Sequence, residues 1–244
     1  MPSDRAHPWL DQDRWDVRFE WGPSGAAAAR TDAVVVVDVL RFTTTVDAAV
    51  ARGVVLHPYR WNDDRGRAFA ERVGARFAEP AGADSAGLSP VRLLALDPGS
   101  RIVLPSPNGS TCAAIASETG AIVVAACLRN ATAVARWLSD RVRSVTVIAC
   151  GERWPDGSLR PALEDHLGAG AVIASLTGNR SAEAAAAAAL WEASADQVPS
   201  MVRSCISGRE ATTRGWQQDL DFAVEVDASA TVPVLRDGAF VDEA

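Results

Sequence analysis

One segment of the chain joins the pattern of a buried strand to residues that can do chemistry. Ala33–Val37 is followed by Asp38, Arg41 and a run of threonines. A continuous apolar run predicts a strand covered on both faces, as in a parallel sheet, and places Asp38 at the carboxyl edge where open α/β folds bind ligands. Its carboxylate could hold a hard metal ion and Arg41 could clamp an anion. Thr43 and Thr44 could cap the next helix at an anion-attracting end, and we include both among the candidate substrate-binding residues. A capped core helix with an incidental Asp–Arg pair explains the segment equally well.

A second loop, residues 105–111, joins another buried-strand pattern to a helix and contains Ser106, Asn108, Gly109 and Ser110. An Asn-Gly pair adopts positive φ at little cost, so successive backbone N–H groups can point inward and bind an anion. Ser110 or the threonine after it is expected to cap the helix. We therefore predict that this loop binds substrate. An ordinary strand-to-helix turn is the alternative.

A third loop supplies three carboxylates. Glu152 follows the expected strand 144–150, and Glu164 and Asp165 fall in the first turn of the next helix. Acidic residues in a first turn stabilise the helix dipole, so capping alone is one explanation. The other is a carboxylate cluster that faces Asp38 across the strand ends. Such a cluster favours Mg²⁺, which keeps several waters and prefers a phosphate-bearing ligand.

A fourth strand-to-helix loop carries Arg129 and Asn130. Asn130 is expected to cap the following helix, and Arg129 points either to the ligand or to solvent. We include both among the candidate substrate-binding residues. Cys150, at the end of a strand, is a conceivable nucleophile.

Strand and helix patterns alternate along most of the chain. This alternation predicts an α/β protein with three α/β/α layers and a mixed, mostly parallel sheet. We expect residues 1–32 to form an N-terminal lead-in packed on the domain, with an edge strand near 16–21, and residues 33–244 to form a single α/β domain. The expected C-terminal elements are a helix over 199–206 and strands over 222–226 and 232–235.

Composition excludes several classes of function. The 244 residues carry a net charge of −7, which argues against a nucleic-acid or anionic-membrane surface. The chain contains no lysine, so Schiff-base catalysis and a P-loop are excluded and arginine is the only fixed cation. No apolar run reaches the roughly 18 residues of a membrane span. Four scattered cysteines without a CxxC pair indicate buried thiols of a cytoplasmic protein, and the N-terminal tryptophans could form a homo-oligomer interface.

Taken together, the loops resemble the ComB family, the 2-phosphosulfolactate phosphatases of coenzyme M biosynthesis. The similarity extends over roughly residues 33–238. The matching motifs, in the family's order, are Asp38-Val-Leu-Arg-Phe-Thr-Thr-Thr45, Ser106-Pro-Asn-Gly-Ser110, Arg129-Asn-Ala131, Ala162-Leu-Glu-Asp165 with Ala169-Gly-Ala171, and a tail with Gly208-Arg209, Gly215, Asp219-Leu220 and Val232-Pro233. The resemblance implies an α/β/α fold and a Mg²⁺-dependent phosphatase. Its substrate would be a small acidic phosphomonoester, 2-phosphosulfolactate first of all.

One region departs from the family pattern. The family carries Gly-Glu-Arg-x-Gly and then Gly-Asn-Ser-Pro, whereas this chain has Ala78-Glu79-Pro-Ala-Gly-Ala and then Gly87-Leu88-Ser89-Pro90. The Glu-Arg pair is missing, and Leu88 stands where the asparagine is expected. If this region helps to bind the substrate, the change bears on which substrate is used.

The working hypothesis is metal-assisted hydrolysis of a phosphomonoester. Asp38, Glu164 and Asp165 would hold Mg²⁺, and Glu152 or Asp165 would act as general base. Arg41 and the backbone amides of the second loop would hold the phosphate or the other acidic end of the substrate. The alternative is a diverged, non-catalytic protein of the same fold that binds a small anion. Clustered carboxylates argue against it, because an anion-binding protein has little use for them without a metal.

Overall fold

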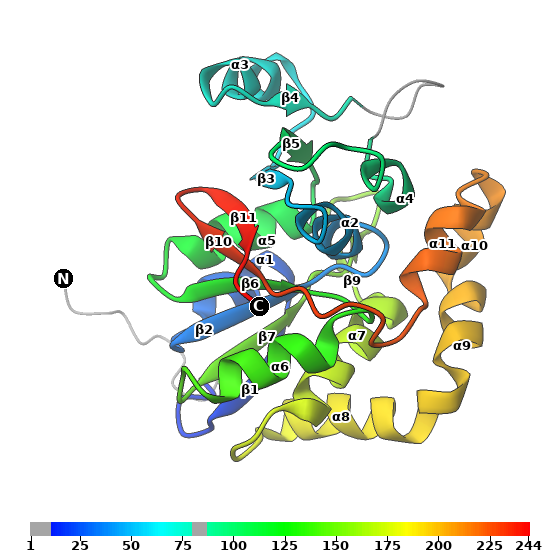
Figure 1. The fold of residues 1–244 in the computed structure, drawn as a ribbon. Helices are drawn as coiled ribbons and strands as arrows, with labels where there is room; N and C mark the ends of the chain where they lie inside the picture. Colours follow the sequence, from blue (N-terminus) through cyan, green and yellow to red (C-terminus); the bar gives the residue numbers. More distant parts are fainter. Residues whose placement is uncertain (1–10, 80–86) are drawn as a thin grey trace.

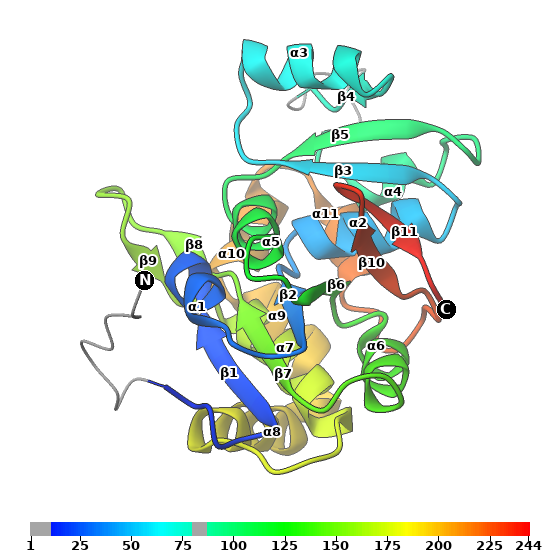
Figure 2. The same ribbon diagram turned by 90° about the vertical axis from the view of Figure 1, so that its left-hand side faces the viewer.

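The computed structural model of the chain describes residues 11–79 and 87–244. A nine-stranded sheet in the order β1-β7-β2-β6-β10-β11-β3-β5-β4 runs through it, and helices cover both faces (Figures 1 and 2). The strands of this sheet are β1 Val17–Trp21, β2 Ala33–Val37, β3 Val55–Tyr59, β4 Arg76–Phe77, β5 Arg101–Pro105, β6 Ile122–Ala126, β7 Val145–Ala149, β10 Pro233–Arg236 and β11 Ala239–Asp242. A separate hairpin is formed by β8 Glu152–Arg153 and β9 Leu159–Arg160.

The helices follow the strands in the predicted alternation, which confirms the three-layer α/β/α architecture. They are α1 Gly22–Ala28, α2 Phe42–Val50, α3 Asp64–Arg72, α4 Pro90–Leu93, α5 Gly109–Ser117, α6 Ala131–Ser139, α7 Leu163–Ser175, α8 Ala182–Ser194, the 3₁₀ helix η2 Ala195–Gln197, α9 Val198–Ser204, α10 Ile206–Thr213 and α11 Gln217–Ala223. Within the described parts of the chain, none of them has both the length and the apolar character that crossing a membrane requires.

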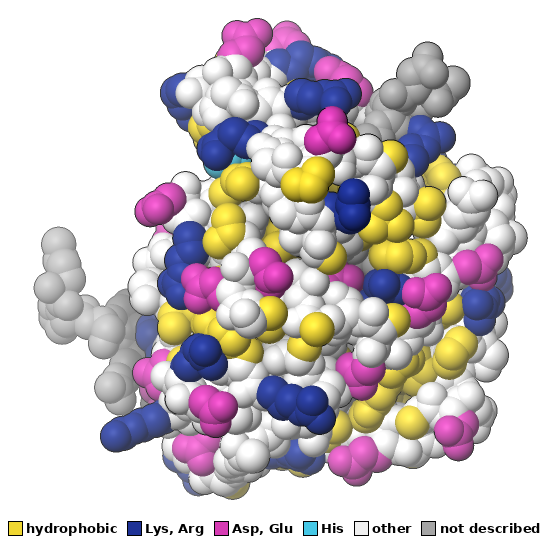
Figure 3. Space-filling view, in the orientation of Figure 1, with side chains coloured by type: hydrophobic (Ala, Val, Ile, Leu, Met, Phe, Trp, Pro, Cys, Tyr) yellow, Lys and Arg dark blue, Asp and Glu magenta, His cyan; other side chains and the backbone are white. Residues whose placement is uncertain are grey.

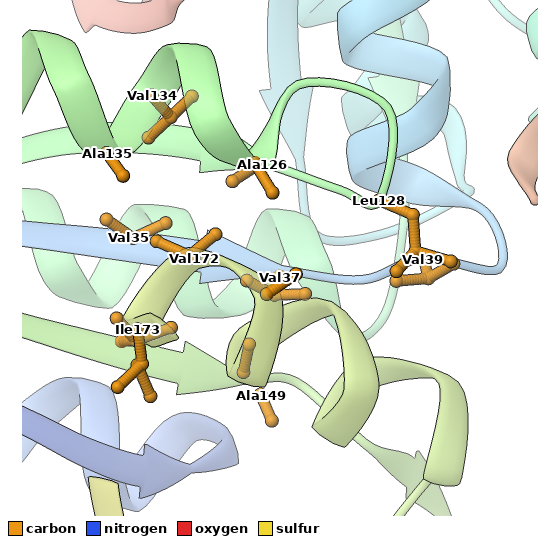
Figure 4. Packing of buried hydrophobic residues seen from close by; sticks show 14 of the residues in the cluster. Val35, Val37, Val39, Ala126, Leu128, Val134, Ala135, Ala149, Val172 and Ile173 are labelled. Atoms are coloured by element: carbon orange, nitrogen blue, oxygen red, sulfur yellow. The ribbon is translucent and has the colours of Figure 1, made fainter. Parts of the chain in front are cut away.

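Strand β2 lies between β6 and β7 and runs parallel to both. All five of its residues are fully buried, as predicted. Val35 and Val37 pack against α6 and α7 (Figure 4), whereas Val34 and Val36 pack with α2 and α5 on the opposite face. Full burial of a valine side chain stabilises the fold by roughly 1.5–3 kcal/mol. The run of valines therefore anchors the strand from both sides and places Asp38 at its carboxyl end.

The sheet is mixed, as predicted, because the C-terminal hairpin enters it antiparallel. β10 and β11 lie between β6 and β3, with Val234 paired to Val124 and Phe240 paired to Leu56. The hairpin thus joins two parallel groups of strands. At the far edge, β1 pairs in parallel with β7, so this part of the N-terminal lead-in belongs to the main sheet.

Two C-terminal predictions are wrong. Residues 222–226 do not form a strand, because Gln217–Ala223 is helix α11. Leu220, Ala223 and Val224 are buried and follow the i, i+3, i+4 spacing of a helix face, so packing selects the helix over the alternating pattern. The single helix expected over 199–206 is two helices, α9 and α10. They meet at Cys205, whose Sγ accepts a hydrogen bond from the N–H of Gly208 at 3.3 Å.

The surface carries charges of both signs. Arginine and acidic side chains are interspersed over the face shown in Figure 3. On this face no single-sign field is available to attract a polyanion or a polycation.

Candidate active site

The loops that follow β2, β5 and β7 meet around a cavity of about 290 Å³, near the lower end of the range for small-molecule sites. Helix α10 and the residue before α11 supply another wall. Both helices lie on the side toward which β2, β6 and β7 run (Figure 1). The lining residues are Asp38, Leu40, Arg41, Phe42, Leu88, Ser106, Pro107, Asn108, Glu152, Ser207, Glu210, Ala211, Arg214 and Trp216.

Asp38 connects the first two loops. It is only 6% exposed. Its Oδ1 accepts the N–H of Phe42 at 3.1 Å, and its Oδ2 accepts the N–H of Gly109 at 3.0 Å. Gly109 can come this close because it lacks a side chain: a Cβ there would lie 2.2 Å from the Phe42 ring and 2.8 Å from Asp38 Oδ2. The carboxylate therefore ties the start of α2 to the start of α5.

The hydroxyls expected to cap these helices hold the backbone of the loops instead. Thr43 Oγ1 donates to the Asp38 carbonyl at 2.8 Å and accepts the Asp38 N–H at 2.9 Å. Thr44 Oγ1 donates to the Val39 carbonyl at 2.7 Å, and Ser110 Oγ donates to a carbonyl of β5 at 3.2 Å. All three side chains are buried and none lines the cavity. The capping predictions for them are wrong, because the Asp38 carboxylate already accepts the first N–H of each helix.

Asp165 connects the first loop to the third. Its Oδ1 accepts the N–H of Val39 and its Oδ2 accepts the N–H of Gly151, both at 2.8 Å. The side chain is 3% exposed. Burial raises the pKa of Asp165, and the charges of Asp38 and Glu164 raise it further. Because both oxygens hold backbone groups, the geometry suits a residue that positions the loops.

Four carboxylates come together at these loop ends. We call Asp38, Glu152, Glu164 and Asp165 the acid cluster. Burial raises the pKa of Asp38 to about 7, and the charges of Glu152 and Glu164 contribute to the rise. Burial also raises the pKa of Glu152, against a hydrogen bond from Asn108 Nδ2 at 3.1 Å. Glu164 is 3% exposed and accepts a hydrogen bond from Cys205 Sγ at 3.2 Å. Negative charges that lie close together away from water repel one another. The site therefore favours the binding of a cation or the protonation of a carboxylate.

Arg41 reaches the same cavity and is held from two sides. Its Nη1 donates to Asp219 Oδ2 at 2.5 Å, and its guanidinium carbon lies 3.7 Å from the centroid of the Trp216 ring. Asp219 is itself fixed by Ser89, whose Oγ donates to Oδ1 at 2.6 Å. These contacts hold a guanidinium group at the cavity wall, within electrostatic reach of Asp38.

Arg129 and Asn130, two of the predicted substrate-binding residues, do not line the cavity. Arg129 pairs with Asp47, Nε to Oδ2 at 3.2 Å, and its guanidinium lies 3.6 Å from the Phe222 ring centroid. Asn130 does not cap α6; its Nδ2 donates to the Thr231 carbonyl at 3.1 Å. Both residues fasten the C-terminal segment to the body of the fold, and these contacts account for them without a ligand.

Sequence reasoning missed the part of the cavity that the C-terminal helices supply. The missed residues are Ser207, Glu210, Arg214 and Trp216, together with Asp219 behind Arg41. The tail motif around Gly208, Gly215 and Asp219 was the available signal.

The departure from the family pattern reaches the cavity through Leu88. Its side chain lines the wall, and its carbonyl accepts a hydrogen bond from Thr45 Oγ1 at 3.2 Å. Ser89 affects the cavity indirectly, because it donates a hydrogen bond to Asp219, which in turn holds Arg41. Residues 80–86 of the departing region lie outside the described residues.

Cys150 lies at the strand end but is poorly suited to nucleophilic attack. It is 2% exposed, and burial together with the neighbouring Cys112 thiol raises the pKa of Cys150 well above its usual value. A nucleophilic cysteine needs the opposite, a lowered pKa and access to the substrate. We expect Cys150→Ser to keep turnover within roughly threefold of the wild type, measured as phosphate release. A total loss of activity in a folded Cys150→Ser protein would contradict this assignment.

The sheet is covered on both faces, and a small cavity lies at its carboxyl edge. Clustered carboxylates and a guanidinium group surround this cavity. This arrangement is typical of an enzyme that acts on a small charged molecule. The comparisons with known proteins specify which kind. The family model described as 2-phosphosulpholactate phosphatase matches residues 24–238. This chain belongs to the 2-phosphosulfolactate phosphatase family, which places it among the phosphoric monoester hydrolases.

Relatives named probable 2-phosphosulfolactate phosphatase match along nearly their whole length. The protein from Thermotoga petrophila is 28% identical over 226 residues, which cover 90% of this chain and 95% of the relative. The protein from Parasynechococcus marenigrum is 32% identical, with 86% and 91% covered, and that from Thermus thermophilus is 30% identical, with 87% and 91% covered.

Proposed function

We propose that this protein is a Mg²⁺-dependent phosphatase that hydrolyses 2-phosphosulfolactate to sulfolactate and phosphate. The observation that carries the proposal is the placement of Asp38, Glu152 and Arg41 on one small cavity. Transfer of a phosphoryl group needs positive charge on its oxygens and a carboxylate for the attacking water. The names of the relatives supply the substrate. A protein that only bound an anion would gain nothing from crowded carboxylates beside it.

The acid cluster has the donors that Mg²⁺ prefers. Mg²⁺ is usually bound by one or two carboxylates, with waters and substrate phosphate completing its shell. Among residues 11–79 and 87–244, no three Asp, Glu, His or Cys side chains make a ready-made metal cage, which is compatible with such a sparse site. We propose Asp38 and Glu164 as the residues that hold the metal. Asp165, which unlike Asp38 does not line the cavity and has both oxygens on backbone N–H groups, holds the loops in place.

Mg²⁺, when bound, would neutralise charge on the phosphoryl oxygens. Arg41 binds a phosphoryl oxygen through the N–H groups that Asp219 leaves available. Glu152 is the general base, because it lines the cavity and because burial raises its pKa, which makes the carboxylate a better acceptor for a proton from water. The hydrogen bond from Asn108 to Oε2 orients that carboxylate. We place the protein in the cytoplasm, because all four cysteines are free thiols.

The test is phosphate release by the purified protein from 2-phosphosulfolactate, with and without Mg²⁺, beside a panel of small phosphomonoesters. We expect Mg²⁺-dependent release from 2-phosphosulfolactate. Release from a different ester alone would keep the chemistry and change the substrate, with Leu88 as the first residue to examine. No release from any ester, with binding retained, would contradict the proposal and support a non-catalytic anion-binding protein.

A further inference from the structure

Ser207 carries a buried hydroxyl that has no hydrogen-bond partner among the described residues. The residue is 7% exposed and lies in the first turn of α10. In the described part of the chain, three buried side-chain polar atoms lack a hydrogen-bond partner: Arg60 Nε, Trp137 Nε1 and Ser207 Oγ. Of the three residues, only Ser207 lines the cavity. Because buried polar atoms are nearly always hydrogen-bonded, a hydroxyl left open at a cavity wall is available to a water or to an acceptor group of a bound ligand.

Arg214 adds a cation to the same wall. Its guanidinium carbon lies 5.2 Å from the centroid of the Trp216 ring, which Arg41 also contacts. The charge of Arg214 lowers the pKa of Arg41, so the two guanidinium groups are close enough to repel each other. Arg214 Nε donates to Glu210 at 2.8 Å, which leaves the terminal N–H₂ groups for another acceptor. Two cations and an open hydroxyl on one wall form a site for an anion.

This wall is separate from the part of the cavity that Asp38 and Glu152 line, and its own carboxylate, Glu210, is paired with Arg214. Asp38 and Glu152 come from the strand-end loops, whereas Ser207 comes from α10 and Arg214 directly follows that helix. Leu88 contributes an apolar surface to the same cavity. We propose that Ser207 and Arg214 form a second anion subsite, which takes the sulfonate group that 2-phosphosulfolactate carries in addition to its phosphate and its carboxylate. The subsite rests on the proposed function and names the class of substrate: a small phosphomonoester with a further strong acid group.

The test compares two substrates that differ only in that group, 2-phosphosulfolactate and 2-phospholactate, with Ser207→Ala and Arg214→Gln variants. Loss of a hydrogen bond to a charged group weakens binding roughly tenfold or more. We expect each variant to raise KM for 2-phosphosulfolactate by roughly that factor and to leave KM for 2-phospholactate within about twofold. The matched control is Arg209→Gln, which removes the same charge from an exposed position of α10 outside the cavity lining and should change neither KM.

A binding measurement separates this inference from the proposed function. Sulfolactate carries no phosphate, and its affinity for the wild type and the variants can be measured by calorimetry without turnover. If the wild type hydrolyses neither ester but binds sulfolactate in a manner that Arg214→Gln abolishes, the proposed function fails and the subsite stands. If the wild type hydrolyses 2-phosphosulfolactate and the variants affect both esters equally or neither, the subsite is refuted and the function stands. Absence of both turnover and sulfolactate binding refutes both.

Discussion

Asp38→Asn is expected to reduce turnover by roughly 10³-fold or more while the protein stays folded. Asparagine has nearly the same shape, but it brings no negative charge and is a poor ligand for Mg²⁺. The side chain lines the cavity and lies beside the other members of the acid cluster. A change of charge at this point therefore removes a metal ligand without moving the loops.

The effect on stability should be small because two terms oppose each other. Both oxygens of Asp38 accept backbone N–H groups. In Asp38→Asn the side-chain NH₂ group replaces one oxygen and faces one of these N–H donors, which lowers the free energy of unfolding by about 1–3 kcal/mol. In the other direction, burial raises the pKa of Asp38 to about 7, so ionising it at neutral pH costs the folded state on the order of 4 kcal/mol. Asparagine avoids that cost. The variant should melt within a few degrees of the metal-free wild type.

The measurement is phosphate release together with a thermal melt. Asp140→Asn is the matched control, because Asp140 is exposed at the end of α6 and outside the cavity lining. That variant should keep full activity. An Asp38→Asn protein within tenfold of wild-type kcat/KM would refute the role assigned to Asp38.

The central part of the fold was predictable because its signals are local. The valines before Asp38 can only be a strand covered on both faces, and the capped or glycine-terminated runs between strands can only be helices. The alternation of strands and helices predicts which loops lie at the carboxyl edge of the sheet. It therefore also predicts that Asp38, Glu152 and Arg41 meet at one cavity. The burial of Thr43 and Thr44 behind that edge does not follow, because a hydroxyl bonds equally well to a ligand or to its own backbone.

The C-terminal part of the site was not predictable from local pattern. Asp219 and Trp216 hold Arg41 from a distance of more than 170 positions along the chain, and nothing near Arg41 in the sequence indicates them. The sequence of residues 222–226 is compatible with a strand, and only contact with the core selects the helix that ends at Ala223. An arginine such as Arg129 can also pair with a buried acid at a remote position, and a loop sequence does not distinguish that from a ligand contact.

Mg²⁺ is expected to stabilise the protein strongly at pH 8 and hardly at all at pH 5. Burial raises the pKa values of Asp38, Glu152 and Asp165, so between about pH 4 and 7 the folded metal-free protein binds more protons than the unfolded chain. Its stability therefore falls as the pH rises through that window. Mg²⁺ competes with those protons and binds only once they leave. The stabilisation by Mg²⁺ is therefore largest at the pH where the metal-free protein is least stable.

The size of the effect follows from mass action. At a Mg²⁺ concentration about 100 times Kd, binding stabilises the folded state by roughly 2.7 kcal/mol, which raises Tm of a domain of this size by about 5–10 °C. Melts at pH 5 and pH 8, with Mg²⁺ or with a chelator, measure the difference, and the chelator should also abolish phosphate release. Asp38→Asn should lose the Mg²⁺-induced shift and Asp140→Asn should keep it. If Tm and turnover at pH 8 are the same with Mg²⁺ and with the chelator, Asp38 and Glu164 do not hold the metal, because losing a bound divalent cation from these two buried carboxylates would change at least one of the two quantities.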